Sequence, residues 1–181
     1  MTRIGFFLLI LFLHGCGGGS SASESRTFDL GLEAPGARLP AVRIGSARAL
    51  APFDGADMQY RLAYRNAAEI ASFASSRWAA TPAEMFRKQL LRATDEGAGK
   101  CVLAIEIQEF TQVFAAQAES EARIEMRIAL SSGAKTLSKQ FTVVESKAGA
   151  DAVSGAAAFV RAANRAIGEI GAWVAAQPDC R

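Results

Sequence analysis

Three runs of alternating apolar and polar residues in the middle of the chain constrain its fold more than any other feature. In the run 102–114, leucine and isoleucine occupy every second position from 103 to 107, and this is the period of a β-strand with one buried face. The runs 122–130 and 137–143 alternate in the same way, and the residues 131–134 between them predict a hairpin turn. The pattern therefore predicts an antiparallel meander with one face against the core.

The first of these runs changes parity partway along. Leu103 and Ile107 share one face, whereas Phe110 and Phe114 fall on the other. One extra residue in the strand would bring all four to the same side, as happens at a β-bulge. We therefore predict a bulge near Glu109.

Two helices are predicted beside these strands. Thr81 is a good N-cap, Pro82 suits the first helical position, and Glu84 completes a capping box, while the glycines near residue 97 should end the helix. The segment 151–176 has apolar residues at intervals of three and four. Its many alanines favour packing on the sheet, although a coiled-coil strand or a lipid-binding helix shows the same periodicity.

Shorter strands are predicted before the first helix, at 28–30, 39–44, 58–65 and 69–73. The order of elements is then strands, helix, strand meander, helix. This order predicts an α/β (α+β-like) fold with a single domain, in which a mixed, mostly antiparallel sheet carries two main helices. Half of the residues are apolar, which is enough to build one core.

The N-terminal segment has the features of a targeting signal. Arg3 precedes the apolar run 4–13, which as a helix would cover about half of a bilayer core. That length fits a signal peptide. The residues Leu13-His14-Gly15-Cys16 resemble the lipobox of bacterial lipoproteins, in which the chain is cut before the cysteine and the cysteine receives acyl chains such as palmitate. We predict a signal peptide at 1–15 and lipidation of Cys16; an ordinary secretory signal with a chance cysteine is the alternative.

A Gly/Ser-rich stretch follows the cysteine. Residues 16–25 are predicted to be a flexible tether, and the folded periplasmic domain is expected at 26–181. Acyl chains buried in a leaflet would hold such a protein firmly on a membrane. The residue after Cys16 is Gly17 rather than aspartate, which by resemblance to enterobacterial sorting favours the outer membrane. We expect the protein on the periplasmic face of that membrane.

The predicted mature chain contains no histidine, because the only one is His14. This excludes Ser-His-Asp and Cys-His catalysis and zinc sites with histidine ligands. We expect no metal, no cofactor and no enzymatic activity, although a serine–lysine dyad or a carboxylate pair stays open. The formal net charge is +2 and there is no basic run, so nucleic acid is not an expected partner.

The two remaining cysteines are far apart in the sequence. Cys101 begins a predicted strand, and Cys180 lies beside the C-terminus. In an oxidising periplasm they could form a disulfide that fastens the last helix to the sheet. The alternative is one buried thiol and one free thiol in the tail.

Several short elements occur in an order that resembles a known family. The lipobox and tether lead to FDLG at 28–31, DMQYR at 57–61 and RWAATP at 77–82, and then to the strand L-x-I-x-I-x-E-F at 103–110 and an alanine-rich last helix. Over nearly the whole mature chain, this order is similar to the ABC-type transport auxiliary lipoproteins, which include the PqiC-like lipoproteins.

The resemblance implies a non-catalytic part in lipid transport. Members of that family accompany an inner-membrane ATPase, a permease and an MCE (mammalian cell entry) substrate-binding protein in systems that move lipids between membranes. The lipoprotein would dock the periplasmic MCE assembly at the outer membrane, with a ring-shaped homo-oligomer and phospholipid contact as further expectations. A stand-alone periplasmic binding or envelope-assembly lipoprotein is the alternative.

Three residues are candidates for a partner interface. Aromatic residues and arginine are enriched at interface hot spots, and this points to Tyr60, Arg61 and Trp78. The alternatives are core packing for the two aromatic residues and a solvated strand face for Arg61. Phe110 and Phe114 would line a lipid groove or pack under the second helix.

Overall fold

The longest strand, β5 (Val102–Ala116), lies in the middle of the sheet. On one side it pairs antiparallel with β6 (Glu119–Ser132), which in turn pairs antiparallel with β7 (Lys135–Ser146). On the other side it pairs in parallel with β2 (Arg43–Ala49) over its first half and with β3 (Asp57–Leu62) over its second half. A single strand thus connects the meander to the N-terminal strands.

The computed structural model describes residues 25–94 and 99–180. Within them the sheet has seven strands, because β4 (Ala71–Trp78) continues antiparallel beside β3, and β1 (Arg26–Phe28) pairs in parallel with β4. The sheet is mixed, and its two longest ladders are antiparallel. The prediction of a single α/β domain with a mixed, mostly antiparallel sheet is confirmed.

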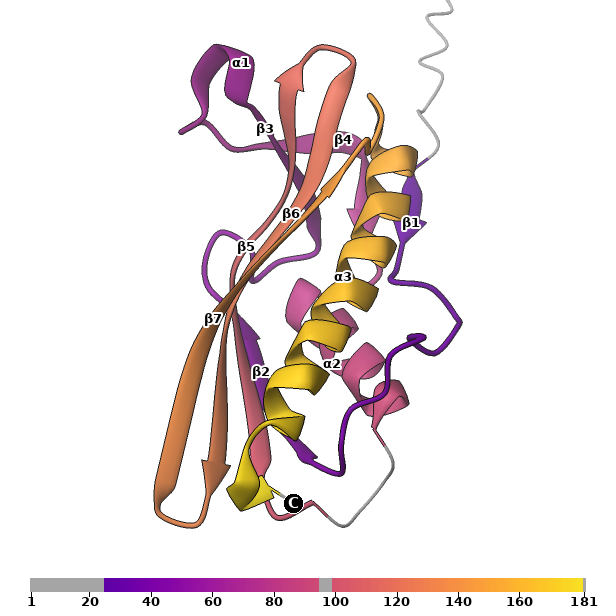
Figure 1. Cartoon of the computed structure of the whole chain (residues 1–181). Coiled ribbons are helices and arrows are strands. Elements are labelled where there is room, and N and C mark those ends of the chain that lie inside the picture. Colours follow the sequence, from indigo (N-terminus) through magenta and orange to yellow (C-terminus); the bar gives the residue numbers. More distant parts are fainter. Residues whose placement is uncertain (1–24, 95–98, 181) are drawn as a thin grey trace, which may run out of the picture.

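The two main helices cover the same face of the sheet (Figure 1). The helix α3 (Ala152–Ala175) lies along β6 and β7, and α2 (Pro82–Ala93) packs on β2 and β5. Two shorter elements complete the fold: α1 (Ala63–Asn66) directly follows β3, and the 3₁₀ helix η1 (Pro178–Cys180) follows α3. Among the described residues, no main helix covers the opposite face of the sheet.

The helix α2 begins at the predicted cap, and α3 begins at the start of the segment predicted for it. The side chain of Thr81 accepts the N–H of Glu84, and Glu84 bonds back to the backbone of Thr81. Asp151 and Ser154 form the same reciprocal arrangement at the start of α3. The end of α2 was predicted too late, because Thr94 is already extended and pairs with Leu39.

The predicted bulge in β5 is confirmed. Ile107 pairs with Met126 and Glu109 pairs with Glu125, so Gln108 is the extra residue. Ile107 and Phe110 are both buried as a result. The bulge restores one apolar face along the whole strand, as the change of parity in the sequence requires.

Aromatic rings fill the space between the sheet and α3. Phe110 stacks on Phe159 of α3 with ring centroids 4.3 Å apart, and Trp78 meets Phe159 edge-on at 5.2 Å. All three side chains are almost completely buried. Phe110 therefore packs under the second helix, and the lipid groove considered at this position is filled by protein side chains.

Two predicted strands end early. The carboxylate of Asp29 accepts the N–H of Gly31, whose φ of +90° suits glycine, so a turn replaces the strand expected over 28–30, and β1 ends at Phe28. The strand expected over 58–65 ends at Leu62, where the helical turn α1 begins.

Two other predicted strands are displaced. The strand expected over 39–44 begins at Arg43, and Leu39 forms only an isolated bridge. The strand expected over 69–73 continues to Trp78, because its second half pairs with both β1 and β3. Pairing with distant strands, rather than local alternation, sets these boundaries.

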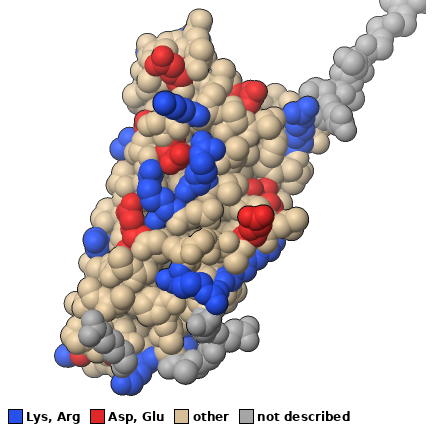
Figure 2. Space-filling model, turned by 45° about the vertical axis from the view of Figure 1, so that its right-hand side comes forward, with Lys and Arg blue, Asp and Glu red and all other residues tan. Residues whose placement is uncertain are grey.

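The helix-bearing side of the molecule carries charges of both signs with broad uncharged areas between them (Figure 2). Arg161 and Arg165 of α3 both bind Glu145 near the end of β7, at 2.9 and 3.0 Å. These ion pairs fasten the first half of α3 to the outer strand. The polar side of α3 is therefore paired within the domain.

Residues 1–24 hold the predicted signal peptide, Cys16 and almost all of the predicted tether, and they lie outside the described residues. In the part of the chain that the structure describes, no helix has both the length and the apolar character needed to cross a membrane.

The cap of α3 gives a pH-dependent prediction. Hydrogen bonds from the backbone and hydroxyl of Ser154 lower the pKa of Asp151. Its carboxylate therefore stabilises the fold above the unfolded pKa of about 3.9, and this contribution is lost as the pH falls from that value through the lower folded pKa. Asp151→Ala should lower the free energy of unfolding by about 1 kcal/mol at neutral pH, and by progressively less as the pH falls through the acid range, measured by urea denaturation.

The exposed loop residue Asp54 offers a matched control. Asp54→Ala should change the stability little at any pH in this range. An equal loss for Asp151→Ala at neutral and acid pH would contradict the role of the carboxylate.

Candidate functional site

A row of residues crosses the face of the sheet that the main helices leave uncovered. Arg61 in β3 pairs with Val113 in β5, which pairs with Glu121 in β6, which pairs with Ser146 in β7. Residues paired across strands project to the same side. Val113 has the opposite parity to Phe110, which faces α3, so this row, here called the polar row, lies on the open face.

Arg61 is held firmly at one end of the polar row. Its guanidinium donates two hydrogen bonds of 2.8 Å to the carboxylate of Glu109 and a third, of 3.2 Å, to the carbonyl of Ala67. The two charged side chains are only 19% and 14% exposed. The hydrogen bonds with Glu109 raise the pKa of Arg61, so its charge is permanent. Arg61 and Glu109 thus form a fixed, largely buried ion pair on the open face.

The glutamate next to this pair is held by another arginine. Glu109 lies opposite Glu125 across β5 and β6, but Glu125 accepts a hydrogen bond of 2.8 Å from Arg123. The amine of Lys135, the lysine spaced for a dyad with Ser132, is paired with Asp179 at 3.3 Å. The charged groups that could have suggested hydrolytic chemistry therefore take part in ion pairs.

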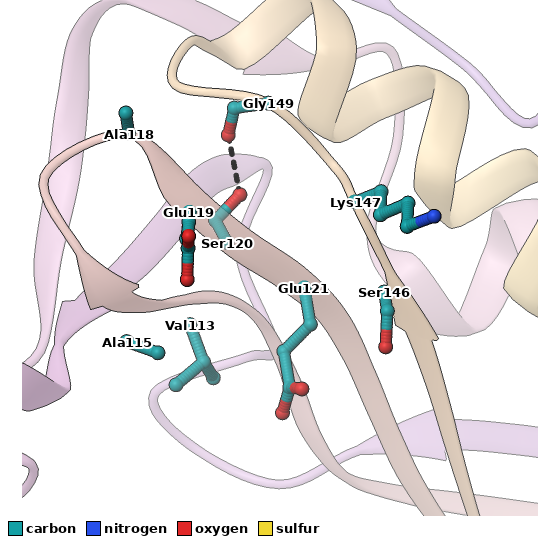
Figure 3. A pocket seen from close by; sticks show the side chains of 9 residues that line it. All are labelled: Val113, Ala115, Ala118, Glu119, Ser120, Glu121, Ser146, Lys147 and Gly149. Carbon is teal, nitrogen blue, oxygen red and sulfur yellow. Dashed lines mark hydrogen bonds between the residues drawn. The ribbon is translucent and has the colours of Figure 1, made fainter.

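A hollow of about 530 Å³ lies at the β7 end of the polar row. Figure 3 shows Glu119 and Glu121 on the same side as Val113, while Lys147 points away from them. The full lining consists of Val113, Ala115, Ala118, Glu119, Ser120, Glu121, Ser146, Lys147 and Gly149. The lining of this hollow therefore combines carboxylates with small and apolar side chains.

A buried glutamine supports the hollow from the helix side. Gln112 of β5 donates to the hydroxyl of Ser120 at 2.8 Å and to the carbonyls of Gly149 and Asp151 at 3.2 and 3.3 Å. It thereby links β5, β6 and the connection into α3. We did not identify Gln112 from the sequence. The available signal was a polar glutamine at a strand position that alternation places on the buried face of β5, because buried polar groups need hydrogen-bond partners.

The same network explains a glycine in α3. A Cβ atom at Gly155 would come within 2.0 Å of the Gln112 side-chain oxygen, whereas one at Gly168, in the same helix, would lie 3.4 Å from Ala37. Gly155→Ala should therefore lower the free energy of unfolding by about 1–3 kcal/mol despite the better helix propensity of alanine. Gly168→Ala, the control, should be neutral or stabilising. Thermal unfolding of both variants measures this, and a stabilised Gly155→Ala would contradict the network.

Tyr60 and Arg61 do not form one surface. They are consecutive residues of β3 and project to opposite faces. The ring of Tyr60 lies 4.7 Å from that of Phe73 and 6.0 Å from that of Phe114, between centroids. Tyr60 is half-buried on the side of the helices, so only Arg61 of the two belongs to the open face.

Trp78 is a core residue, and its assignment as an interface candidate is wrong. Its side chain is 1% exposed and packs against Phe110 and Phe159. The tryptophan comes at the end of β4, where the strand faces α3. Phe114 is also buried, beside Tyr60.

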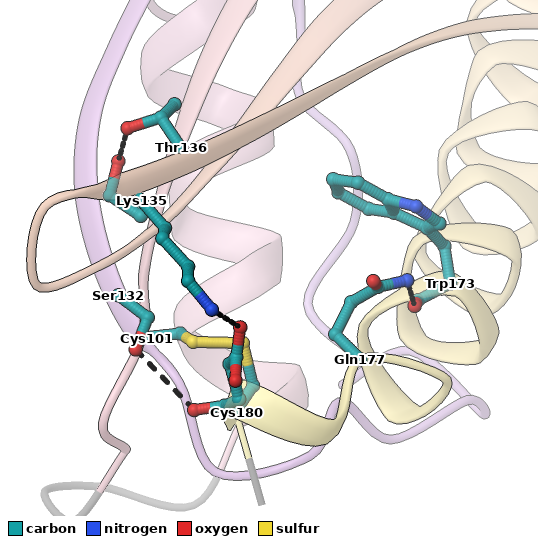
Figure 4. The surroundings of a disulfide bond; sticks show 9 residues. Cys101, Ser132, Lys135, Thr136, Trp173, Gln177 and Cys180 are labelled. Carbon is teal, nitrogen blue, oxygen red and sulfur yellow. Dashed lines mark hydrogen bonds and ion pairs between the residues drawn. A yellow bond between two sulfur atoms is a disulfide. The ribbon is translucent and has the colours of Figure 1, made fainter.

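The structure joins Cys101 and Cys180 by a disulfide, with their Cα atoms 5.2 Å apart (Figure 4). Next to it, Lys135 pairs with Asp179, and the hydroxyl of Ser132 donates to the backbone carbonyl of the same aspartate. These contacts fasten η1 to the start of β5 and to the turn between β6 and β7.

The cysteines are 79 positions apart. In the chain-entropy model, a bond that closes so long a loop lowers the entropy of the unfolded chain and so stabilises the folded state by about 4 kcal/mol. Replacing both cysteines by serine should lower the free energy of unfolding by about that amount. Reductant should have the same effect on the unmodified protein and none on the double variant. Equal stability of the oxidised and reduced protein would contradict this prediction.

Within residues 25–94 and 99–180, no group of three or more histidine, cysteine, aspartate and glutamate side chains is placed to hold a metal ion. The charged groups of the polar row are instead spread across the strands.

Two solved structures share this fold. Protein XCC0632 from Xanthomonas campestris, assigned to the family DUF330, matches with a TM-score of 0.68 and 21% identity over 81% of this chain and 93% of that chain. An uncharacterized protein matches with a TM-score of 0.65 and 11% identity over 83% of this chain and 99% of that one. No family model matches the chain, and no curated protein does. At these identities the likeness shows the fold alone.

Proposed function

We propose that this chain is a lipid-anchored, non-catalytic auxiliary component of an ABC/MCE-type lipid transport system, which docks the periplasmic substrate-binding assembly at the outer membrane. Three features of the sequence support the proposal: the lipobox ending at Cys16, the Gly/Ser tether, and the order of elements that resembles the auxiliary lipoproteins. The fold is compatible with it, because the described residues form one domain that follows the tether directly.

The filled interior is the observation that favours docking over lipid carriage. A protein that carries lipid needs a cavity for acyl chains, but Phe110, Phe159 and Trp78 occupy the space between sheet and helix. The hollow beside the polar row has Glu119 and Glu121 in its lining, and carboxylates do not suit acyl chains. A partner would therefore meet the outer surface of this domain.

The open face supplies groups that fit a protein partner. The turn α1 that follows Arg61 carries Tyr64, which is 43% exposed, and the exposed Arg65. Exposed aromatic residues next to arginine are frequent interface anchors. We therefore assign the docking surface to α1 and the neighbouring end of the polar row.

Site-specific photo-crosslinking in membranes tests this assignment. A photoreactive residue in place of Tyr64 should crosslink to the MCE protein, whereas one in place of Leu91 should not, although Leu91 is 41% exposed and lies on α2. Cys16→Ser, which cannot be acylated, should strongly reduce the Tyr64 adduct, because the domain is no longer held at the membrane.

Gene neighbours give an independent check, since an ATPase, a permease and an MCE protein are expected beside this gene. Absence of any MCE adduct from Tyr64, or equal adducts from Tyr64 and Leu91, would contradict the proposed docking. Adducts with a different envelope protein would instead support a stand-alone binding lipoprotein.

A further inference from the structure

The outer edge of β7 is a second exposed surface. Among the described strands, β7 pairs only with β6 and ends the sheet. In an antiparallel pair, alternate residues direct both their N–H and their C=O away from the partner strand. An edge strand therefore presents a row of backbone groups to which another strand can add.

Two observations show which residues of β7 point outward. Ser132 and Lys135 pair across a two-residue turn, and the residues that flank such a turn bond to each other, so Lys135 points inward. At the other end, the carbonyl of Val144 accepts a hydrogen bond from Arg165 of α3 and so points away from β6. Both observations indicate that the even-numbered residues of β7 direct their backbone groups away from β6.

Only one end of this edge is covered. Arg165 caps Val144, and the ion pairs of Arg161 and Arg165 with Glu145 hold α3 beside it. Toward the hairpin turn, all of the residues 135–140 are exposed. In the described part of the chain, no hydrogen bond reaches the backbone groups of the remaining outward residues, which are Thr136, Ser138, Gln140 and Thr142.

The side chains along this edge are basic and apolar. The segment 135–144 contains two lysines and no acidic residue. Lys135, Leu137 and Lys139 alternate on the helix-bearing side of β7, where Leu137 is 48% exposed and the amine of Lys139 lies 4.9 Å from the ring centroid of Phe141. A strand with acidic residues around an apolar one complements this side.

We infer that the edge of β7 over residues 136–142 is a strand-addition site for an extended, acidic segment of a partner protein. Backbone hydrogen bonds to the outward residues supply affinity. Lys139, which has no ion pair with a described residue, selects a carboxylate, whereas the amine of Lys135 is already paired with Asp179. The site lies apart from α1 and the polar row. The inference specifies the chemistry of the bound segment, and it does not depend on whether the partner is an MCE protein.

A second copy of this chain is disfavoured on the edge in the register that would match Leu137 with Leu137. Antiparallel pairing of two β7 strands centred on Leu137 would set Lys135 of one copy opposite Lys139 of the other, and like charges at opposed positions are unfavourable. Lysines on an edge strand thus discourage self-association while leaving the edge open to an acidic strand.

Residue-resolved amide exchange by NMR tests the site on the full mature domain. The probe is a short fluorescein-labelled peptide of repeating Glu-Thr-Val-Thr, and the matched control is a peptide of repeating Lys-Thr-Val-Thr. The glutamate peptide should slow exchange at the outward amides of Thr136, Ser138 and Gln140, which exchange freely in the unbound protein. The amides of Leu137 and Lys139, already bonded to β6, should change little.

Three variants distinguish peptide binding at the β7 edge from effects of a substitution on folding or on overall charge. Ser138→Pro removes an outward N–H without removing a bond to β6, so the fold should be retained, while binding measured by fluorescence anisotropy should weaken by at least about tenfold. Ser138→Ala should bind as the unmodified protein does. Lys139→Glu should weaken binding of the glutamate peptide and improve binding of the lysine peptide.

Three results would each overturn the inference. The first is no binding of the glutamate peptide, or equal binding of both peptides. The second is protection of amides elsewhere than on β7. The third is self-association in analytical ultracentrifugation together with protection of the outward amides in the absence of peptide. That result would show that a second copy of the chain binds the edge.

Discussion

The single-residue bulge in β5 is the constraint on which both faces of the sheet depend. It lies between Ile107 and Glu109 and turns the second half of the strand over, so that Ile107 and Phe110 are buried on the same side. Phe110 then stacks on Phe159, and α3 has an apolar surface to cover along the full length of the sheet. A strand without the extra residue would turn its phenylalanines to solvent.

The bulge also builds the open face. With Phe110 turned toward α3, its neighbour Glu109 points the other way and meets Arg61 of the parallel strand β3. One face of the sheet is therefore closed by aromatic packing, and the other carries paired charges in a row. This division is the structural reason for proposing docking rather than enclosure of a ligand.

The two ends of the edge strand β7 are attached to the domain by different contacts. At one end of β7, α3 covers the edge with arginine contacts to Val144 and Glu145, while at the other end the disulfide and the contact of Lys135 with Asp179 hold η1 near the hairpin turn. The stretch between these two attachments keeps its outward backbone groups exposed to solvent. A rigid strand held at both ends is well prepared to receive another strand, because little order is lost on binding.

The sequence by itself determined the elements that depend on neighbouring residues: the three-strand meander, the bulge, and the helix starts at Thr81 and Asp151. Periodicity and capping act within a few positions, so they can be read locally. Only the tertiary structure decided that β2 and β3 pair in parallel with β5, that Trp78 is a core residue, and that Gln112 holds the start of α3. These outcomes depend on which distant strands become neighbours, and a local pattern does not specify its partner across the sheet.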